Sequence, residues 1–475
     1  MTFLGLEATG DPAVIDGATG EVTTFRELIS LGRTTLQPLG ATKALVFLLA
    51  RNDRFSIAAY AGAVLSGHAV ALLDARSTVA VSAEVLATYR PAWIACPTGD
   101  AQRLAAAGVC IDSVTPVAGG EMARTPHPGP AQLEPALAVL LSTSGTTGSG
   151  KFVRLSERNV DANARAIASC LRLSAADRPV TSLPLAYSFG LSILNSHWVA
   201  GAPVVLTDES VMQPAFWEQF RERGCTTLAG VPFTYQMLER IGFRDMELPD
   251  LRVLQQAGGA LDRRLTAVYA DWAASTGRMF FVMYGQTEAT ARIAFVPPDR
   301  LSEKIGSAGV AIPGGRLSID GGAGGDGDGS GEGEVVYAGP NVMLGYATGS
   351  DDLAAGDTTH GVLRTGDIGY LDDDGFLFLT GRSKRIAKVF GLRINLDEVE
   401  TAIRESGPAA VVGGDDGVWA FCAFGTDDDV AAIGTRLARR FGLHHSAVRF
   451  RRVDEIPTTA SGKTDYRQVA RWIPG

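Results

Sequence analysis

Short, continuously apolar runs recur along the chain and set its predicted framework. Residues 44–50 contain no polar side chain, and shorter runs follow at 93–95 and 139–141. Runs of this kind are typical of strands that are buried on both faces of a parallel sheet. Helix-favouring stretches separate them, and this alternation predicts an α/β fold with largely parallel sheets.

Two positions in the pattern predict where helices begin. Thr24 with Glu27 three residues later fits a capping box. Ser156 is placed to cap a second helix, which we expect to run from Asn159 to Leu171.

The most membrane-like segment, Phe55 to Leu73, has 19 residues without a formal charge. It also contains serine, glycine and histidine, so it makes a poor membrane span. We expect a buried helix that stops near Gly67, followed by a strand at 69–73, and no membrane span.

A run of small hydroxyl residues and glycines follows the apolar run at 136–141. Its members are Ser142, Thr143, Ser144, Gly145, Thr146, Thr147, Gly148, Ser149, Gly150 and Lys151. Glycines let the backbone approach a ligand closely, successive backbone N–H groups form an anion-binding concavity, and the lysine adds positive charge. The run therefore predicts a phosphate site. It is not a P-loop, because Phe152 stands where that loop needs Ser or Thr for Mg²⁺.

Composition narrows the class of protein. A chain of 475 residues is long enough for two or more domains. The net charge of −9 argues against non-specific nucleic-acid binding, which needs a basic surface. The five cysteines include no C-x-x-C pair, and the chain start lacks a signal-peptide pattern, so we expect reduced thiols in a cytoplasmic protein.

The stretch from Ser144 to Lys151 resembles the S-G-T-T-G-x-P-K loop of the adenylate-forming superfamily, with Gly150 in place of proline. This superfamily includes acyl- and aryl-CoA synthetases, peptide-synthetase adenylation domains and luciferases. Further motifs follow in the family's order. They are the turn Gly258-Gly259-Ala260, the Y-G-x-T-E signature Tyr284-Gly285-Gln286-Thr287-Glu288, the 364–370 segment with Asp367, then Arg382, and a P-x-T-x-x-G-K loop that ends at Lys463.

The resemblance implies a role for each motif in binding MgATP. The 143–148 loop with Lys151, the 258–260 turn and Tyr284 to Gln286 would bind the nucleotide. Thr287 would donate to the α-phosphate, and Glu288 would be an oxygen ligand of Mg²⁺. The carboxylate of Asp367 would accept the ribose hydroxyls, with a turn cap as its alternative role, and Arg382 would pair with ribose or phosphate oxygens. Lys463 would be catalytic together with Thr287 and Glu288.

The resemblance also implies the architecture. We expect a large N-terminal core over residues 1–382, built of layered, mostly parallel sheets with helices and a small β-barrel-like subdomain. A small, mobile α+β lid would occupy residues 383–475. Lys384 would be its hinge, and Gly391 would line the thiol channel.

The sequence also contains candidates for the acid pocket. Tyr187, Ser188, Phe233 and Gly258 are its candidates, although the first two are equally plausible as packing residues. Tyr187 stands in an expected strand end and turn at 182–190, where family members often have histidine. No aspartate lies nearby to hold an ammonium group, so an aryl or acyl carboxylic acid is favoured over an α-amino acid.

The predicted reaction joins this acid to ATP, releases pyrophosphate and leaves an acyl-AMP. The acyl group would pass to a thiol, either CoA or the phosphopantetheine of an acyl carrier protein. Three alternatives remain: transfer to an amine, activation of another small oxyacid such as nitrite, and a non-catalytic nucleotide-binding regulator. Retention of Glu288 and Lys463 argues against the last. The oligomeric state stays open.

Overall fold

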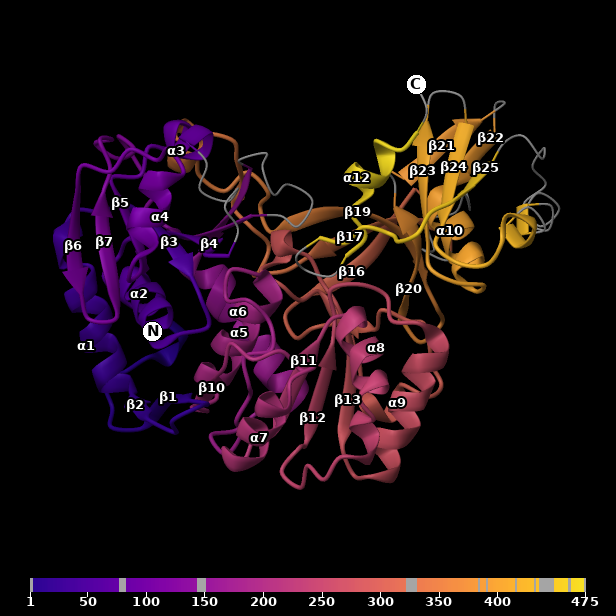
Figure 1. The fold of residues 1–475 in the computed structure, drawn as a ribbon, viewed down its shortest axis with the longest axis horizontal. Helices are drawn as coiled ribbons and strands as arrows, with labels where there is room; N and C mark the ends of the chain where they lie inside the picture. The colour runs from indigo at the N-terminus through magenta and orange to yellow at the C-terminus, as the bar shows by residue number, and fades with distance from the viewer. Residues whose placement is uncertain are drawn as a thin grey trace. The chain divides into compact units, whose positions relative to one another are not determined.

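The computed structural model describes residues 3–76, 83–142, 151–321, 331–382, 385–389, 392–414, 417–430, 433–434, 448–459 and 463–473. The chain forms two compact units (Figure 1). The first comprises residues 1–316 and 337–363, and the second comprises residues 317–336 and 364–475.

An eight-stranded sheet is the largest in the first unit. Its spatial order is β18 (Gly345–Ala347), β9 (Phe152–Ser156), β8 (Leu137–Ser142), β4 (Ala69–Asp74), β3 (Leu45–Ala50), β5 (Trp93–Pro97), β7 (Gly120–Arg124) and β6 (Ser113–Val117). The four central strands β8, β4, β3 and β5 are parallel, and the strands at both edges pair antiparallel. The apolar runs are the buried central strands, as predicted.

Strands β8 and β9 flank the predicted phosphate loop. They pair antiparallel, with Ser142 opposite Phe152, so residues 143–150 connect two adjacent strands. Sheet pairing thus fixes both ends of this connection.

The helices that the capping residues predict are present in the structure. The helices in this part of the unit are α1 (Phe25–Thr35), α2 (Arg54–Leu65), α3 (Ala83–Tyr89), α4 (Asp100–Ala106), α5 (Glu157–Leu171) and α6 (Ser188–Val199). Both predicted caps are present: Thr24 forms a capping box with Glu27, and Ser156 forms one with Asn159. Gly32 allows helices α1 and α2 to pack closely, since a Cβ at this position would lie only 2.2 Å from the carbonyl oxygen of Ala58.

The uncharged segment at 55–73 is helix α2 followed by strand β4, as predicted. Among the helices that the structure describes, none combines the length and apolar character needed to cross a bilayer.

A second sheet holds three parallel strands, β11 (Thr227–Gly230), β12 (Val253–Gln256) and β13 (Met279–Tyr284), and two antiparallel ones, β14 (Ala294–Val296) and β15 (Val310–Ala311). Figure 1 shows α8 (Pro232–Arg240) and α9 (Arg263–Ser275) beside it, with α7 (Pro214–Glu222) near the chain's lower edge. A small sheet of β1 (Pro12–Asp16), β2 (Val22–Thr24) and β10 (Val204–Leu206) completes the unit.

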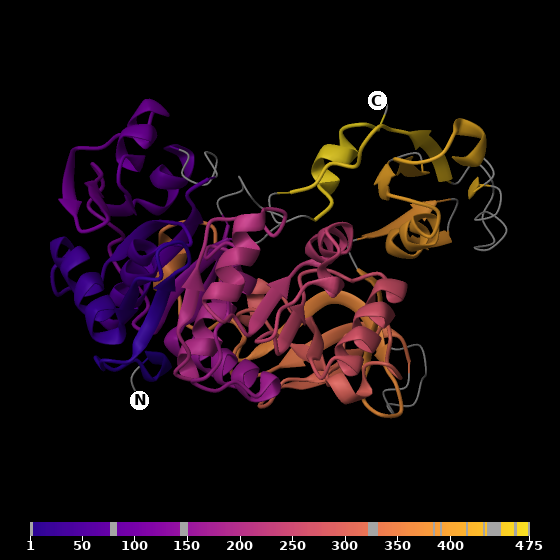
Figure 2. The same cartoon turned by 60° about the horizontal axis from the view of Figure 1, so that its bottom comes forward.

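Helices α5 and α6 join the two large sheets into layers (Figure 2). Val160 and Leu194 belong to the core of the first sheet, while Ile167 and Ile193 belong to the core of the second. Each helix therefore contributes side chains to both cores.

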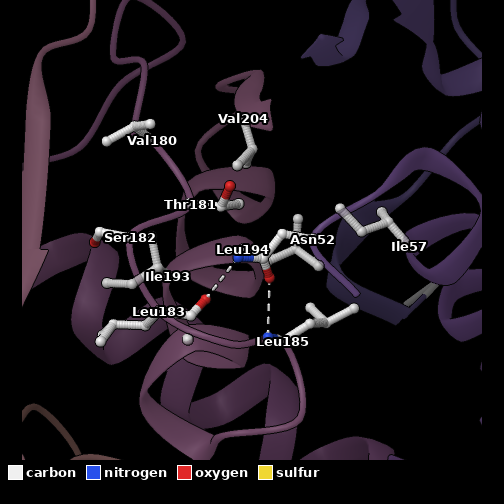
Figure 3. A pocket seen from close by; sticks show the side chains of 11 residues that line it. Asn52, Ile57, Val180, Thr181, Ser182, Leu183, Leu185, Ile193, Leu194 and Val204 are labelled. Atoms are coloured by element: carbon white, nitrogen blue, oxygen red, sulfur yellow. Dashed lines mark hydrogen bonds between the residues drawn. The ribbon is translucent and has the colours of Figure 1, made fainter. Parts of the chain in front are cut away.

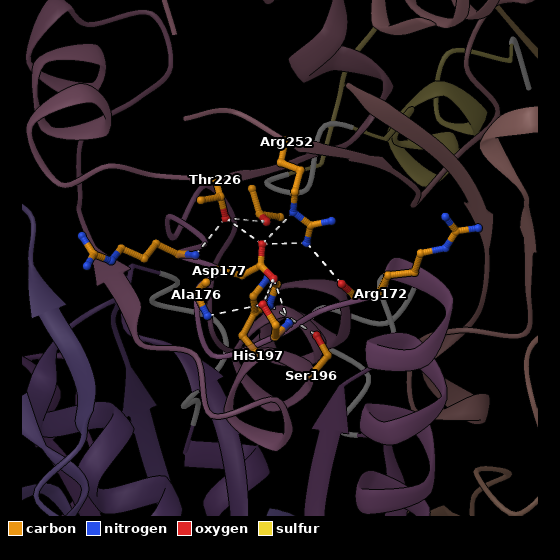
Figure 4. Close-up of polar contacts among 10 residues, drawn as sticks. Arg172, Ala176, Asp177, Ser196, His197, Thr226 and Arg252 are labelled. Carbon is orange, nitrogen blue, oxygen red and sulfur yellow. Dashed lines mark hydrogen bonds and ion pairs between the residues drawn. The ribbon is translucent and has the colours of Figure 1, made fainter. Parts of the chain in front are cut away.

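A polar cluster anchors the amino-terminal ends of β11 and β12 (Figure 4). The buried Asp177 accepts hydrogen bonds from Arg252 at 2.6 Å and from the Thr226 hydroxyl at 3.1 Å. Burial alone would raise the pKa of Asp177, but these bonds and those from Ser174 offset it and lower the pKa. With one end of the sheet fixed in this way, the carboxyl ends of the strands deliver their loops to the opposite edge.

The second unit contains a four-stranded sheet in the order β16 (Arg316–Asp320), β17 (Gly333–Ala338), β19 (Val362–Leu371) and β20 (Leu377–Arg382). Its C-terminal part contains the hairpin β21 (Ile386–Val389) and β22 (Leu392–Asn395). A sheet of β23 (Ala409–Gly414), β24 (Gly417–Cys422) and β25 (Val448–Arg452) follows, with helices α10 (Leu396–Arg404) and α12 (Tyr466–Ala470). The predicted fold class is confirmed. The predicted boundary between 382 and 383 stays a prediction.

Candidate active site

The segment that carries Tyr187 and Ser188 is held in a fixed turn (Figure 3). The Asn52 side-chain amide donates to the Leu183 carbonyl at 3.2 Å and accepts from the Leu185 N–H at 3.1 Å. Helix α6 then begins at Ser188, so the expected strand end and turn over 182–190 is wrong from that residue onward. The turn is closed by Gly190, where a Cβ would lie 2.2 Å from the Pro184 carbonyl oxygen and only glycine fits.

The cavity beside this turn is about 10 Å³, room for about one water molecule. It is lined by Asn52, Leu183 and Leu194 among others, and Tyr187 is not among its lining residues. It is therefore too small to be the acid pocket.

Tyr187 and Ser188 each contact a second predicted site residue. The Tyr187 hydroxyl lies against Gly258, where a Cβ would approach it to 2.6 Å and where φ is +83°. The Ser188 hydroxyl lies 3.2 Å from the Thr287 hydroxyl, and both side chains are buried. Burial raises the pKa of Tyr187. Four predicted residues from three loops thus lie together.

The role of Phe233 in the acid pocket stays a prediction. Phe233 is 48% exposed at the first turn of α8, and its neighbour Pro232 is the residue that packs near Gly259. The 258–260 turn itself is held by the Gln256 amide, which donates to the Gly259 carbonyl at 2.9 Å.

The Tyr284-to-Glu288 signature leaves the end of β13 and forms a short 3-10 turn at Thr287–Ala289. A Cβ on Gly285 would lie 1.7 Å from the Ala291 carbonyl oxygen, so glycine is required there. The Gln286 amide donates to the Tyr284 hydroxyl at 3.4 Å.

Tyr346 joins the phosphate-loop lysine to the predicted metal ligand, a role that the sequence analysis did not assign. Its hydroxyl donates to Glu288 Oε1 at 2.8 Å, and Lys151 Nζ lies 3.3 Å from its ring centroid. The Met343 N–H also donates to the Glu288 carbonyl at 2.9 Å. The signal that could have identified Tyr346 is its position at the end of the segment Met343-Leu-Gly-Tyr346, which follows the Tyr284-to-Glu288 signature in the family's order of motifs.

The donor set at Glu288 suits Mg²⁺ bound together with a nucleotide. Mg²⁺ is usually held by one or two carboxylates plus substrate phosphates. Within the described ranges, no group of three or more His, Cys, Asp or Glu side chains forms a metal cage. Glu288 supplies one such carboxylate, with Lys151 and Thr287 nearby for the phosphates, so these residues fit a site that the protein shares with the nucleotide.

In the second unit, Asp367 and Arg382 lie opposite each other on β19 and β20. The Arg382 Nε donates to Asp367 Oδ1 at 2.8 Å, and Asp367 is buried while Arg382 is largely exposed. The structure therefore brings this predicted pair together.

Lys463 lies three residues before Tyr466, the first residue of α12. Its N–H donates to the Thr459 hydroxyl at 3.3 Å, and its carbonyl accepts from the Thr459 N–H at 2.7 Å. Thr464, the next residue, accepts a hydrogen bond from Arg404 at 2.9 Å.

Some predicted residues lie outside the described ranges. They are Thr143, Ser144, Gly145, Thr146, Thr147, Gly148, Lys384 and Gly391.

The chain is similar to several known proteins. A family model described as "AMP-binding enzyme" matches residues 8–347. The sulfoacetate–CoA ligase of Cupriavidus necator is 32% identical over 72% of this chain and 68% of its own. The 2-succinylbenzoate–CoA ligase of Geobacillus kaustophilus is 30% identical over 71% and 70%.

A solved structure of similar fold is the o-succinylbenzoate CoA synthetase of Bacillus subtilis in complex with its acyl-adenylate intermediate. It is 23% identical, covers 97% of this chain and 95% of its own, and has a TM-score of 0.75. The same enzyme is also known in complex with ATP and a magnesium ion.

Proposed function

The chain belongs to the AMP-binding enzyme family and is an ATP-dependent, AMP-forming acid–thiol ligase; within this class we propose that its acid is a small carboxylic acid and its thiol acceptor is CoA. The predicted family, fold class and reaction type are confirmed. The carrier-protein acceptor and the cytoplasmic location stay predictions.

The observation that carries the site assignment is the contact chain Lys151–Tyr346–Glu288 beside Thr287. The reaction brings two anions together, because a carboxylate oxygen attacks the α-phosphorus and pyrophosphate leaves. Preorganised donors and cations are the usual means of lowering such a barrier. Thr287 would donate to the α-phosphate, and Lys151 would approach the phosphates. Glu288 would hold Mg²⁺, which neutralises phosphate charge when bound.

The names of the relatives support both the acid and the acceptor. Both are CoA ligases, and sulfoacetate and 2-succinylbenzoate each carry a second anionic group. In the second half-reaction the CoA sulfur attacks the acyl carbon of the acyl-AMP. A thioester forms and AMP leaves with the electron pair of the broken C–O bond.

The second unit would supply the remaining roles. Asp367 would accept the ribose hydroxyls, and Arg382 would orient that carboxylate through their 2.8 Å hydrogen bond. Lys463 would orient the carboxylate in the first step. A hinge at Lys384 would then exchange Lys463 for the thiol channel at Gly391, so that one site serves two steps.

The test is pyrophosphate release with MgATP over a panel of acids, with products identified by mass spectrometry with and without CoA. We expect Lys463→Ala to slow release about 100-fold or more, with ATP binding nearly unchanged. The exposed Gln468→Ala on α12 is the matched control and should retain activity. Continued turnover of Lys463→Ala would disprove the role of this lysine.

A second assay isolates the acceptor. Synthetic acyl-AMP supplied with CoA should yield the thioester in both wild type and Lys463→Ala, because the lysine serves only the first step. If the acyl-AMP persists with CoA but is consumed when an amine or a carrier protein is added, that nucleophile is the acceptor in place of CoA.

A further inference from the structure

Arg292 is a buried cation that the proposed mechanism does not use. Its side chain is 1% exposed, and within the described residues no carboxylate pairs with it. Its Nε contacts Met283 Sδ at 3.4 Å, its guanidinium lies 3.9 Å from the Phe189 ring centroid, and its NH2 group has no hydrogen-bond partner. Isolated buried charges are costly and are normally paired.

Gln255 is a second buried polar side chain that has no hydrogen-bond partner among the described residues. It is fully buried, and neither atom of its amide has a hydrogen-bond partner. It stands on β12 directly between Ala229 of β11 and Phe281 of β13. Adjacent residues of a sheet share a face, and both neighbours belong to the cluster that contains Phe189 and Met283.

The backbone that presents Arg292 is strained and held in place. Thr290 and Ala291, directly before it, have φ values of +62° and +139°, which side-chain-bearing residues rarely adopt. Amide groups of Asn163 and Asn341 both donate to the Arg292 carbonyl at 3.0 Å. Strain of this kind persists where the position of a side chain matters.

Arg292 also borders the predicted acid pocket. Phe189, on which Arg292 lies, directly follows Ser188, and the rings of Phe189 and Tyr187 meet edge to face at 6.3 Å. Arg292 also follows Glu288 closely in the chain. A group held here would therefore belong to the acid rather than to ATP.

We propose that Arg292 and Gln255 receive a second anionic group of the acid, so that the preferred substrates are dianionic acids such as dicarboxylates and sulfonocarboxylates. A guanidinium donates two parallel hydrogen bonds to a carboxylate or sulfonate, and the Gln255 amide adds a donor. The inference rests on the proposed function and names the substrate class of that same site.

The test compares acids that differ only in the second charge. Succinate is paired with butyrate, glutarate with pentanoate, and homophthalate with phenylacetate, and kcat/KM is measured from pyrophosphate release. We expect at least one dianion to exceed its partner about tenfold or more. If every dianion is equal to or poorer than its partner, the inference is wrong, and this comparison needs no variant.

Arg292→Gln assigns the effect to the residue. It should lower kcat/KM for the dianion about 100-fold and for the monoanion less than about threefold, so that the preference disappears. Arg292→Lys keeps the positive charge but loses the two parallel N–H donors of the guanidinium, so its preference for the dianion should lie between those of wild type and Arg292→Gln. The control is Arg278→Gln, since Arg278 also lies over an aromatic ring, Trp272 at 5.0 Å, and should leave the preference unchanged. Equal losses for both acids in Arg292→Gln would overturn the inference.

Binding without ATP separates this inference from the proposed function. Succinate alone should raise the melting temperature of wild type and Arg278→Gln but not of Arg292→Gln. If no acid releases pyrophosphate, the proposed function fails, and this pattern of melting temperatures would still support the anion site. A shift in none or in all three proteins would overturn it.

Discussion

Two largely buried arginines, one in each unit, differ in how their positive charge is compensated. Arg292 and Arg385 each lie 3.9 Å over an aromatic ring, Phe189 and Tyr466 respectively. Arg385 also pairs with Asp397 at 2.5 Å and Glu400 at 2.8 Å, whereas the described residues offer Arg292 no carboxylate. Burial lowers the pKa of Arg292, while for Arg385 the carboxylates offset burial and raise the pKa.

The difference separates a structural charge from a binding one. Glu400 accepts from Arg385, Arg404, Tyr466 and the Val411 N–H, so its network is complete within the protein. Arg292 lacks such partners and is suited to a ligand that supplies them. The same residue type thus stabilises one unit and equips the other for recognition.

Removal of Glu400 should have the largest effect on stability. Glu400→Ala leaves Arg385 partly unpaired in a buried site, and we expect the second unit to lose about 3–5 kcal/mol. Hydrogen exchange of peptides over 396–404 and 409–414 measures this loss. The exposed Asp428→Ala should change exchange by less than about 0.5 kcal/mol. Equal protection in both variants would contradict the structural role of the network.

A matched pair of substitutions tests the comparison directly. Arg385→Met removes the cation that Asp397 and Glu400 share and should lower stability by about 3 kcal/mol. Arg292→Met removes an unpaired buried charge, so stability should stay unchanged or rise by about 1 kcal/mol. Hydrogen exchange of each residue's own sheet provides the measurement. A large loss in Arg292→Met would mean that its charge is already satisfied and structural.

A third buried basic side chain, His197, predicts how the stability of the protein depends on pH. The Nδ1–H group of His197, on helix α6, donates to the Ile193 carbonyl at 2.8 Å, and among the described residues its Nε2 has no hydrogen-bond partner. Burial lowers its pKa to about 4, below the ordinary value of 6.5. The unfolded chain therefore binds the extra proton first, and stability falls as pH drops from 6.5 towards 4.

The expected loss is about 2 kcal/mol by pH 4.5. Urea unfolding of wild type and His197→Gln at pH 7, 6, 5 and 4.5 measures it. The slope over this window should be shallower in the variant, which still carries a hydrogen-bonding side chain. Parallel slopes would show that other groups cause the acid sensitivity.

The sequence predicted the features that depend on local pattern. The caps at Thr24 and Ser156, the buried central strands and the order of motifs all follow from neighbours in the chain, whereas the hydrogen bond between Asp367 and Arg382 was not predicted. The helix that starts at Ser188 was missed because its first turn lacks a capping side chain.

What the sequence could not show is which charges have partners. Arg292 looks like any other arginine until its distance from every carboxylate is known. Tyr346 and Lys151 are far apart in the chain, and antiparallel pairing of β18 with β9 brings their segments together. The exposure of Phe233 likewise depends on how α8 packs. These are properties of tertiary packing rather than of composition or spacing.

The smallest expected effect concerns a second cation on a ring, Lys151 over Tyr346. Tyr346→Phe keeps the ring but removes the hydrogen bond to Glu288, which corresponds to about 1 kcal/mol and a severalfold loss in kcat/KM for pyrophosphate release. Tyr346→Leu removes the ring as well and should be worse, because Lys151 then loses its support. Equal activity of the two variants would mean that only the hydroxyl matters. In that case the contact between Lys151 and the Tyr346 ring contributes nothing to activity. The contact between Arg292 and the Phe189 ring would then also be a weaker explanation of how the Arg292 charge is stabilised.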